Sequence, residues 1–467
     1  MIPAKLHSSS FVVNFINSIF LFLTRKYRRT YIIFLFTTFI LLSCGSSPES
    51  DKATDSTAQK IRLIILPPPA PLSKIETERI KVACEKWYDT VLAPKGFYGG
   101  MLVAKNGNII FEKYNGTSHY GGTDAISDTT SLHIASVTKT FTAMAVLKLW
   151  QDAKLNIDDE FSNYFPQFNY PGVTVRSLLN HRSGLPNYTH YLTHIGWDIT
   201  KPVTNVDVLN TLISHKASLI DIAPPNTKFS YCNTNYALLA LLIEKVAGVP
   251  YSNYLNTTFF APLQMKNTFV YNLADSLKVT PSFDWKGRLI PFNFLDAVYG
   301  DKNIYTTPQD LLIWDRALSS NEIFTNQILD QAYKPYSNEK PGVKNYGLGW
   351  RMNIYDNTKK MIFHNGWWHG SNAVFIRLIP EKATIIVIGN KFTRAIYHAR
   401  VLANIFGDYY SAEEEEEAAD TSKPTDSLTA NAGNTILHKP KISRKDSLLL
   451  EKFKDKNAAP NTRKKGN

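Results

Sequence analysis

Cysteine is scarce in this chain, which argues against two common kinds of scaffold. The 467 residues contain only Cys44, Cys84 and Cys232. No two of them have the spacing of metal ligands, and three cysteines cannot form a disulfide framework. We therefore expect no metal, and nothing else in the sequence indicates an organic cofactor. A bridge between Cys84 and Cys232 stays open, because the sequence neither supports nor excludes it.

A basic stripe of the kind that binds nucleic acid is also lacking, although the net charge is +12. The basic residues are scattered, or they lie near the ends in the runs 25–29 and 439–465. Nucleic-acid binding needs Lys and Arg gathered on one surface, commonly interleaved with aromatic residues. We therefore expect no nucleic-acid partner.

The apolar run before Cys44 falls short of the roughly 20 residues that a membrane span requires. Residues 25–44 give a basic start, RKYRR, then YIIFLFTTFILL, and end in Leu-Leu-Ser-Cys. This resembles the lipobox of bacterial lipoprotein signal peptides, which implies that Cys44 carries a lipid. We expect a lipoprotein of the cell envelope, anchored to a membrane outside the cytoplasm. A short uncleaved anchor is the alternative. A further apolar stretch at 11–23 suggests a translation start downstream of Met1.

The rest of the chain divides into three parts by composition. After the signal peptide (1–44), residues 45–72 are first small and polar and then extended and proline-rich, so we predict a flexible tether. Residues 73–410 have the mixed pattern of one folded domain, with 44% hydrophobic residues in the whole chain to fill its core. The tail 411–467 is acidic and then basic, and we expect it to be disordered.

Strand patterns lie at both ends of this domain, with helical patterns between them. The first pair of strands surrounds Asn106-Gly107, a strong hairpin signal, and the last pair surrounds residues 380–382. Helical spacing is found at 74–92, 206–214, 234–246 and 308–318. We predict an α/β (α+β) domain whose antiparallel sheet is built from both ends of the domain and is flanked by helices.

The run SVTKTFTAMAVLKLW carries the first chemical motif. Residues three apart share one face of a helix, so Ser136 would place its hydroxyl within reach of the Lys139 amine. A serine needs a base to take its proton, and a buried lysine can be neutral enough to act as one. The same spacing occurs at Ser337 and Lys340, where Pro341-Gly342 favours a turn. Read alone, Ser136 could equally be an ordinary helix start.

Two further motifs follow in the chain. Tyr231-Cys232-Asn233 precedes a long apolar helix, where a phenol could relay a proton and an amide could hold a carbonyl. His364-Asn365-Gly366 lies on a late strand, where a glycine lets a bound acyl group approach the backbone. A core tyrosine and a structural histidine are the plain alternatives.

In this order, Ser-x-x-Lys, Tyr-x-Asn and His-x-Gly resemble the serine β-lactamase and penicillin-binding protein superfamily. The branch is the one related to class C β-lactamases and to D-specific peptidases and esterases. The resemblance covers roughly residues 75 to 407 and extends to the segments KLNIDDEFSNYFPQF, VRSLLNHRSGLPNY, PNTKFSYCNTNYALLA, APLQMKNT, GDKNIYTTPQDLLIWDRAL and YGLGW.

The resemblance implies a sheet, a mostly helical subdomain and a site at their junction. It also implies acyl-enzyme chemistry, in which Ser136 attacks and Lys139, alone or with Tyr231, accepts the proton. Tyr231 would pass the proton to the leaving group, and Asn233 would orient the substrate. The backbone N–H groups of Ser136 and Trp367 would form the oxyanion hole.

Some positions depart from the family's pattern. His364 stands where many relatives have a lysine, and we expect it to titrate near neutrality and to hold a positive charge less firmly. Trp367 and Trp368 are bulky where small residues are frequent, so they predict a narrow cleft or one that stacks a ring. Cys232 is expected to be a packing residue.

The predicted function is an extracytoplasmic serine hydrolase acting on an amide or ester, whether a D-amino-acid peptide, a β-lactam or an ester. Its substrate would be a small molecule or a short peptide. The departure at His364 makes β-lactam hydrolysis less secure than acyl-enzyme chemistry itself. The alternative is a non-catalytic lipoprotein of the same fold that binds penicillin or cell-wall peptides, or senses them.

Overall fold

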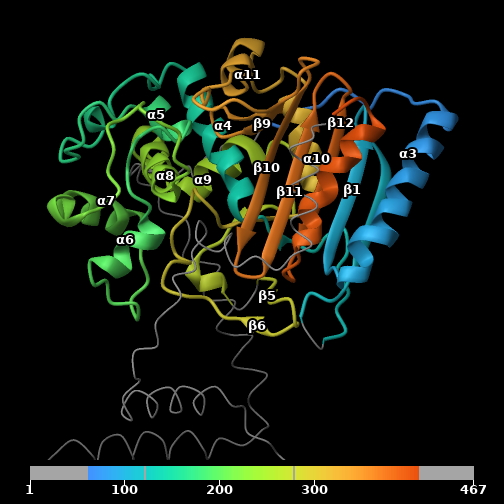
Figure 1. Cartoon of the computed structure of the whole chain (residues 1–467), viewed down its shortest axis with the longest axis horizontal. Helices are drawn as coiled ribbons and strands as arrows, with labels where there is room; N and C mark the ends of the chain where they lie inside the picture. Colours follow the sequence, from blue (N-terminus) through green and yellow to red (C-terminus); the bar gives the residue numbers. More distant parts are fainter. Residues whose placement is uncertain (1–61, 120–121, 277–278, 410–467) are drawn as a thin grey trace, which may run out of the picture. The chain divides into compact units, whose positions relative to one another are not determined.

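The computed structural model describes residues 62–119, 122–276 and 279–409 of the chain (Figure 1). The predicted signal peptide, Cys44, the first part of the tether and the tail from residue 411 lie outside these residues. Within the described residues, the helices are all too short or too polar to cross a membrane.

One antiparallel sheet of seven strands forms the centre of the domain, in the order β2-β1-β12-β11-β10-β9-β8. The first two strands come from the start of the domain and pair directly with the last one, as Met101 opposite Val387 shows. The sheet built from both ends of the domain is therefore confirmed. The strands are β1 (Gly99–Lys105), β2 (Asn108–Asn115), β8 (Lys344–Tyr346), β9 (Arg351–Ile354), β10 (Lys360–Trp368), β11 (Ser371–Leu378) and β12 (Ala383–Gly389).

The first hairpin turns where the sequence predicts it. Asn106 and Gly107 both have positive φ, 53° and 79°, which is the backbone of the two-residue turn that Asn-Gly favours. The pair β11 and β12 turns at residues 379–382. The two predicted hairpins are thus present.

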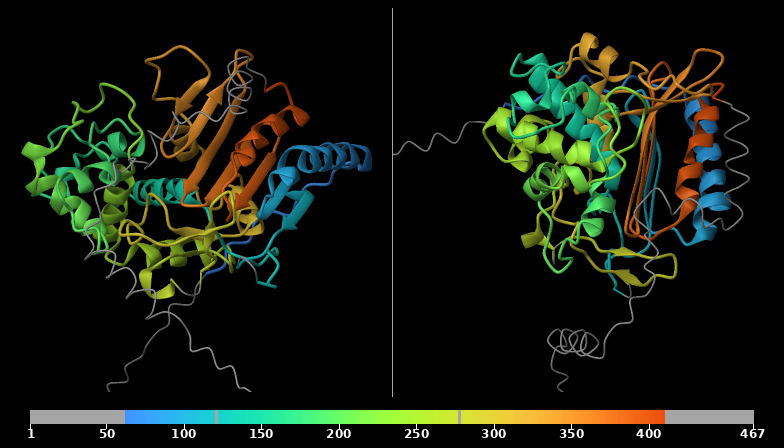
Figure 2. Two further views of the ribbon diagram at one scale, coloured as in Figure 1. Left: turned by 60° about the horizontal axis from the view of Figure 1, so that its bottom comes forward. Right: turned by 60° about the vertical axis from the view of Figure 1, so that its left-hand side comes forward.

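Each face of the sheet is covered by its own layer of helices, and Figure 2 (right) shows the sheet nearly edge-on between them. α3 (Lys74–Trp87) and the 3₁₀ segment η8 (Arg394–Ile405) cover one face, which we call the α3 face. α4 (Thr138–Gln151), α8 (Asn233–Ala247) and α10 (Pro308–Leu318) lie on the other, the α4 face. Side chains alternate between the two cores, so Met361 and Phe363 point to the α3 face while Ile362 points to the α4 face.

A mostly helical region lies beside the α4 face and includes α8 (Figure 1). α7 and α8 match the predicted helical runs to within one residue, and α10 matches its run at both ends. The remaining helices are α5 (Val175–Leu179), α6 (Tyr188–His194), α7 (Asn205–Ser214), α9 (Tyr251–Leu255) and α11 (Asn326–Ala332). The small strands are β3 (Leu132–His133), β4 (Phe269–Val270), β5 (Ser282–Phe283), β6 (Leu289–Ile290) and β7 (Ile304–Thr306).

Residues 62–72, assigned above to the flexible tether, are bonded to the domain. Ile64 N–H donates to the Pro262 carbonyl over 2.9 Å, and Ala70 N–H donates to the Asn106 carbonyl over 3.1 Å. Ile64 and Leu66 also pack against the main core. The segment is extended, as predicted, but its apolar residues fix it to the domain, so the tether boundary lies nearer the N-terminus.

Candidate active site

Ser136 lies in a tight turn that leads into α4. A 3₁₀ turn spans Ala135–Val137, and the α-helix begins at Thr138. Ala135 has φ 46°, a left-handed conformation that costs a residue with a side chain about 1–3 kcal/mol. The backbone is therefore strained at the residue before the predicted nucleophile, and Ser136 itself stays half-buried.

Lys139 is fully buried, and its amine faces Ser136. Its Nζ lies 3.0 Å from Ser136 Oγ and donates to the Asp301 carbonyl over 2.7 Å. Pairing of β3 with β7 brings the Asp301 segment to this point. Since a carbonyl only accepts, it fixes one N–H of the amine and leaves the nitrogen directed at the serine. The predicted nucleophile and base are thus in hydrogen-bond contact.

Tyr231 stands on the other side of the lysine, just before α8. Its ring centroid lies 5.1 Å from Lys139 Nζ. The ring centroid of the buried His181 lies 4.4 Å from that of Tyr231. His181 Nδ1 also accepts a hydrogen bond from the backbone N–H of Cys232 over 3.1 Å. His181 therefore holds the loop at two successive residues, Tyr231 and Cys232.

Gly366 on β10 makes the close approach that its residue type allows. A Cβ at this position would lie 2.2 Å from the carbonyl oxygen of Ile134, beside the Ser136 turn. β9 pairs with β10 only along Lys360–Phe363, so the stretch of β10 from His364 onward lies beyond β9. A stretch without a paired strand on that side is where an acyl group could align, which is the predicted role of this strand.

His364 is neutral, which contradicts the expectation of a residue that titrates near neutrality. Its side chain is fully buried, and its Nδ1 lies 2.7 Å from the Asn365 carbonyl while Nε2 lies 3.2 Å from the Tyr346 hydroxyl. Because a carbonyl needs a donor, the proton sits on Nδ1 and Nε2 accepts from the tyrosine. Burial, and then the charges of Arg351 and Lys139, hold the pKa of His364 well below its usual value. His364 cannot replace a lysine charge.

A comparison with protein families identifies the chain. The beta-lactamase family model matches residues 89–405, a range that contains Ser136, Tyr231 and His364. The chain belongs to the beta-lactamase family. This confirms the resemblance drawn from the motifs.

Individual relatives agree with this assignment. Penicillin-binding protein 4* of Bacillus subtilis (strain 168) is 28% identical over 360 residues, which are 72% of this chain and 79% of that protein. Protein flp of Staphylococcus aureus (strain MRSA252) is 29% identical over 313 residues, which are 62% of this chain. The match covers only 58% of protein flp.

Three solved structures illustrate the shared fold. A penicillin-binding protein from Bacillus halodurans gives a TM-score of 0.61 at 22% identity, over 68% of this chain and 98% of that one. A penicillin-binding protein homologue from Pyrococcus abyssi gives 0.60 at 24% identity, over 69% and 77%. A D-amino acid amidase from Ochrobactrum anthropi SV3 gives 0.58 at 21% identity, over 74% and 99%. At these identities the likeness shows the fold alone.

The two tryptophans after Gly366 point to opposite faces of the sheet, so only Trp368 can narrow a cleft or stack a ring on the α4 face. The Trp367 side chain points to the α3 face, because alternation places it on the side of Phe363, and its ring packs against Phe392 with centroids 5.5 Å apart. Trp368 faces the other way and donates from Nε1 to Asp296 over 2.6 Å. Only the backbone of Trp367 can contribute to an oxyanion hole, and that role stays a prediction.

Asn233 stands at the start of α8, close in sequence to Tyr231. It is half-buried at the first position of α8, two residues after Tyr231. Among the described residues, its side chain makes no hydrogen bond to Ser136, Lys139 or Tyr231. Orientation of a substrate by Asn233 therefore stays a prediction.

Two residues near Tyr231 escaped the sequence analysis. Arg351 opens β9, and its guanidinium carbon lies 4.9 Å from the Tyr231 ring centroid, while its buried Nε finds no hydrogen-bond partner in the described part of the chain. His181 lies under the same ring. Arg351 directly follows the segment YGLGW, and His181 lies within VRSLLNHRSGLPNY, two segments that resemble the family. Nothing in a single sequence marks either residue as a neighbour of Tyr231.

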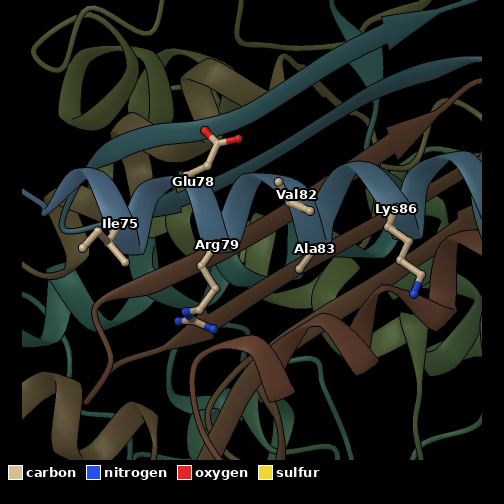
Figure 3. A pocket seen from close by; sticks show the side chains of 6 residues that line it. All are labelled: Ile75, Glu78, Arg79, Val82, Ala83 and Lys86. Atoms are coloured by element: carbon tan, nitrogen blue, oxygen red, sulfur yellow. The ribbon is translucent and has the colours of Figure 1, made fainter.

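A hollow on the molecular surface lies elsewhere and has no bearing on this chemistry. It runs along the outer side of α3, where Figure 3 shows its lining side chains, Ile75, Glu78, Arg79, Val82, Ala83 and Lys86. No serine, cysteine or histidine is among them. It also lies on the α3 face, with the sheet between it and Ser136.

The two cysteines in the described residues are both free and buried, so they form no bridge here. Cys84 belongs to the core on the α3 face. Cys232 lies in the middle of the tyrosine motif, and its Sγ packs 3.4 Å from the Leu185 carbonyl. Burial raises the pKa of both thiols. Cys232 is thus a packing residue, as expected.

Proposed function

We propose that this protein is a serine hydrolase that cleaves an amide or ester through an acyl-enzyme. The contact of 3.0 Å between Ser136 Oγ and a fully buried Lys139 amine carries this proposal. In the first step Lys139 takes the hydroxyl proton as Oγ bonds to the substrate carbonyl carbon. The bond to the leaving amine or alcohol then breaks, and the proton passes to that group. In the second step water attacks the acyl-serine by the same route, releasing the acid.

Tyr231 is the proposed carrier of the proton between Lys139 and the leaving group. Its ring lies beside the amine, and the loop that holds it is bound by His181 on one side and begins α8 on the other. A phenol held in this way can receive a proton and give it up without a change of backbone conformation. The left-handed turn at Ala135 fixes the backbone directly before the nucleophile.

The substrate that best fits the charges carries a carboxylate. Arg351 is permanently cationic, lies against Tyr231 and has a buried Nε that no described residue bonds, whereas His364 is neutral. A guanidinium of this kind favours an anionic group. The relatives are named as penicillin-binding proteins and a D-amino acid amidase. We accordingly propose a peptide-like acyl compound, either a D-amino-acid peptide or a β-lactam.

The place of action is proposed from the N-terminal sequence alone. The lipobox-like end at Cys44 supports a lipid anchor in the cell envelope, with the domain outside the cytoplasm. Growth of the producing cells with a radiolabelled fatty acid tests this, with Cys44→Ala as the control. Label on the parent chain alone supports the anchor, and label on neither chain refutes it.

The direct test of the enzyme is the mass of the whole chain after mixing with a fluorophosphonate and, separately, with a penicillin. The parent protein should gain one adduct and Ser136→Ala should gain none while keeping the same thermal unfolding midpoint. Decay of a penicillin adduct would indicate β-lactam hydrolysis, and a lasting one would indicate a penicillin-binding protein. No adduct from either reagent would refute the enzyme and favour a non-catalytic binding or sensory protein of this fold.

A further inference from the structure

A second lysine is buried a short distance from Lys139 and has no part in the mechanism above. The Lys302 side chain is 2% exposed. Its Nζ donates to the Tyr188 hydroxyl over 2.5 Å and lies 3.5 Å from Asp301 Oδ1. The face of Trp368 covers it, with 4.6 Å between Nζ and the ring centroid. A buried ammonium group is costly unless it is paired, so the presence of Lys302 at this position calls for an explanation.

Asp301 connects this second lysine to the first. Its backbone carbonyl accepts the Lys139 amine over 2.7 Å. Its carboxylate, 1% exposed as a residue, accepts the Tyr188 hydroxyl over 2.9 Å and is paired with Lys302. The residue that positions the proposed base is therefore itself positioned by Lys302 and Tyr188.

Most of the other groups around Lys139 are uncharged. α8 contributes Tyr236, whose ring centroid is 5.6 Å from Nζ, and the loop before it contributes Tyr231 and the buried thiol Cys232. His181 and His364 are both buried, and their pKa values lie well below the usual range, so they are neutral. The charged groups are Arg351, Asp301 and Lys302, with Asp296 beyond Lys302.

The two lysines influence each other electrostatically. Burial lowers the pKa of Lys302, the carboxylates of Asp301 and Asp296 oppose that effect, and the charge of Lys139 lowers it further. Lys302 and Lys139 are like-charged side chains held against the same aspartate, so they repel each other when both are protonated.

We propose that Lys302 is a positioning residue for the proposed base: it balances the Asp301 carboxylate, fixes the Asp301 carbonyl against the Lys139 amine, and so keeps that amine free to accept the proton of Ser136. The inference rests on the proposed function. Without the Lys302 charge, the carboxylate of Asp301 would act alone on Lys139 and would favour its ammonium form. Without that carboxylate, the Lys302 charge would act alone and would favour the neutral amine.

The test is the pH dependence of acylation by a fluorophosphonate in the whole chain. The acid limb is the part of the profile where the acylation rate falls as the pH is lowered. In Lys302→Met its midpoint should move to a higher pH by about one unit, because an unbalanced carboxylate stabilises the Lys139 ammonium. In Asp301→Asn it should move down by about as much. The double variant should lie near the parent. Opposite shifts that cancel are a signature of charge, which a loss of packing alone would not give.

Three controls keep the result decisive. Lys302→Arg retains the charge and should keep the parent's acid limb. Lys359→Met removes a lysine that pairs with Glu381 over 2.7 Å, far from the site, and should leave the limb unchanged. Thermal unfolding identifies any variant that does not fold. If Lys302→Met does not fold, Asp301→Asn and the double variant still test the proposal. The proposal would be overturned if the acid limb stays in place in both single variants, or if it moves in the same direction in both.

A second measurement separates this inference from the proposed function. The Cε resonance of Lys139, assigned with Lys139→Arg in ¹³C-lysine-labelled protein, reports the titration of the amine without any reaction. It should show the same opposite shifts in the two single variants. If the parent is never acylated but these shifts are found, the proposed function fails and the electrostatic role of Lys302 stands. If the resonance titrates alike in all variants, the role of Lys302 fails.

Discussion

The two faces of the central sheet differ in what they bury. The α3 face is packed with aliphatic, aromatic and sulfur side chains, such as Met361, Val374 and Ile376. The α4 face adds buried ionisable residues to an apolar core, among them Lys139, Asp301 and His364. Both faces are formed by the same strands, so the difference comes from the layer that each face meets.

The difference separates stability from chemistry. Apolar burial stabilises by roughly 25 cal/mol per Å² on either face. Buried ionisable groups stabilise little and are costly when a partner is lost, so they are weak contributors to the fold. Perturbed groups that converge on one nucleophile indicate a functional site. The predictions below therefore expect loss of activity, and a loss of stability in acid, from the α4 face, and loss of stability alone from changes on the α3 face.

The largest effect is expected from Lys139→Met. The variant loses the base but keeps an apolar stem, so the fold should remain while fluorophosphonate acylation slows by about 10²–10⁴-fold. Acylation rates and circular dichroism at pH 7.5 check this. A matched change on the α3 face, Met361→Leu, should keep the parent's rate. A Lys139→Met variant that reacts within threefold of the parent would remove the lysine from the mechanism.

Gly366→Ala is expected to cost somewhat less. Its Cβ would lie 2.2 Å from the Ile134 carbonyl oxygen, so β10 and the Ser136 turn must separate. A displacement of about 1 Å can lower a rate by about 10²-fold. Gly248→Ala is the matched control, because its Cβ would meet no atom within 4 Å. That control should lose about 1 kcal/mol of stability to its positive φ and no activity. Equal rates in the two variants would contradict the close approach.

The sequence predicted the order of elements and the central pair of residues well, for physical reasons. Spacing along one chain segment decides whether Ser136 can reach Lys139, and turn residues such as Asn106-Gly107 decide where a hairpin forms. Both are local properties. The antiparallel sheet followed because strands were recognisable at both ends of the domain.

What the sequence could not supply is the environment that distant segments create together. His364 was expected to titrate near neutrality, but burial beside Arg351 and Lys139 keeps it neutral. Arg351 and Lys302 were not recognised, since their roles depend on contacts with Tyr231 and Asp301. Strand alternation alone could have shown that Trp367 and Trp368 point to opposite faces.

Acid should weaken the α4 face selectively. His133 on β3 is buried, and desolvation lowers its pKa to about 4, below the unfolded value of about 6.5. The unfolded chain therefore binds a proton that the folded chain refuses, and the stabilisation present above pH 6.5 is lost as the pH falls toward 4. At pH 5 this residue alone should lower the free energy of unfolding by about 2 kcal/mol, a factor of about 30.

Urea unfolding at pH 7.5 and pH 5 measures the acid effect. His181 and His364 should add to it in the same direction, because their pKa values are also lowered. His133→Asn should reduce the difference between the two pH values. Ile376→Val on the α3 face should lose about 1 kcal/mol at both pH values alike. A parent protein equally stable at pH 5 and 7.5 would show that these histidines are not held neutral by the fold.

The smallest effect, and the most specific, is expected at Arg351. It is the fixed cation beside Tyr231, and a charged hydrogen bond to a substrate carboxylate contributes at least about 1.5 kcal/mol, or about tenfold in binding. Arg351→Met should therefore raise KM about tenfold for a depsipeptide with a free carboxylate and leave its carboxamide analogue unchanged. Arg176→Met, which removes a guanidinium paired with Asp158 at the surface, is the matched control and should alter neither substrate. A loss of equal size on both substrates would mean that Arg351 only supports the Tyr231 loop, and the distinction between the two faces would then rest on Lys139 and Gly366.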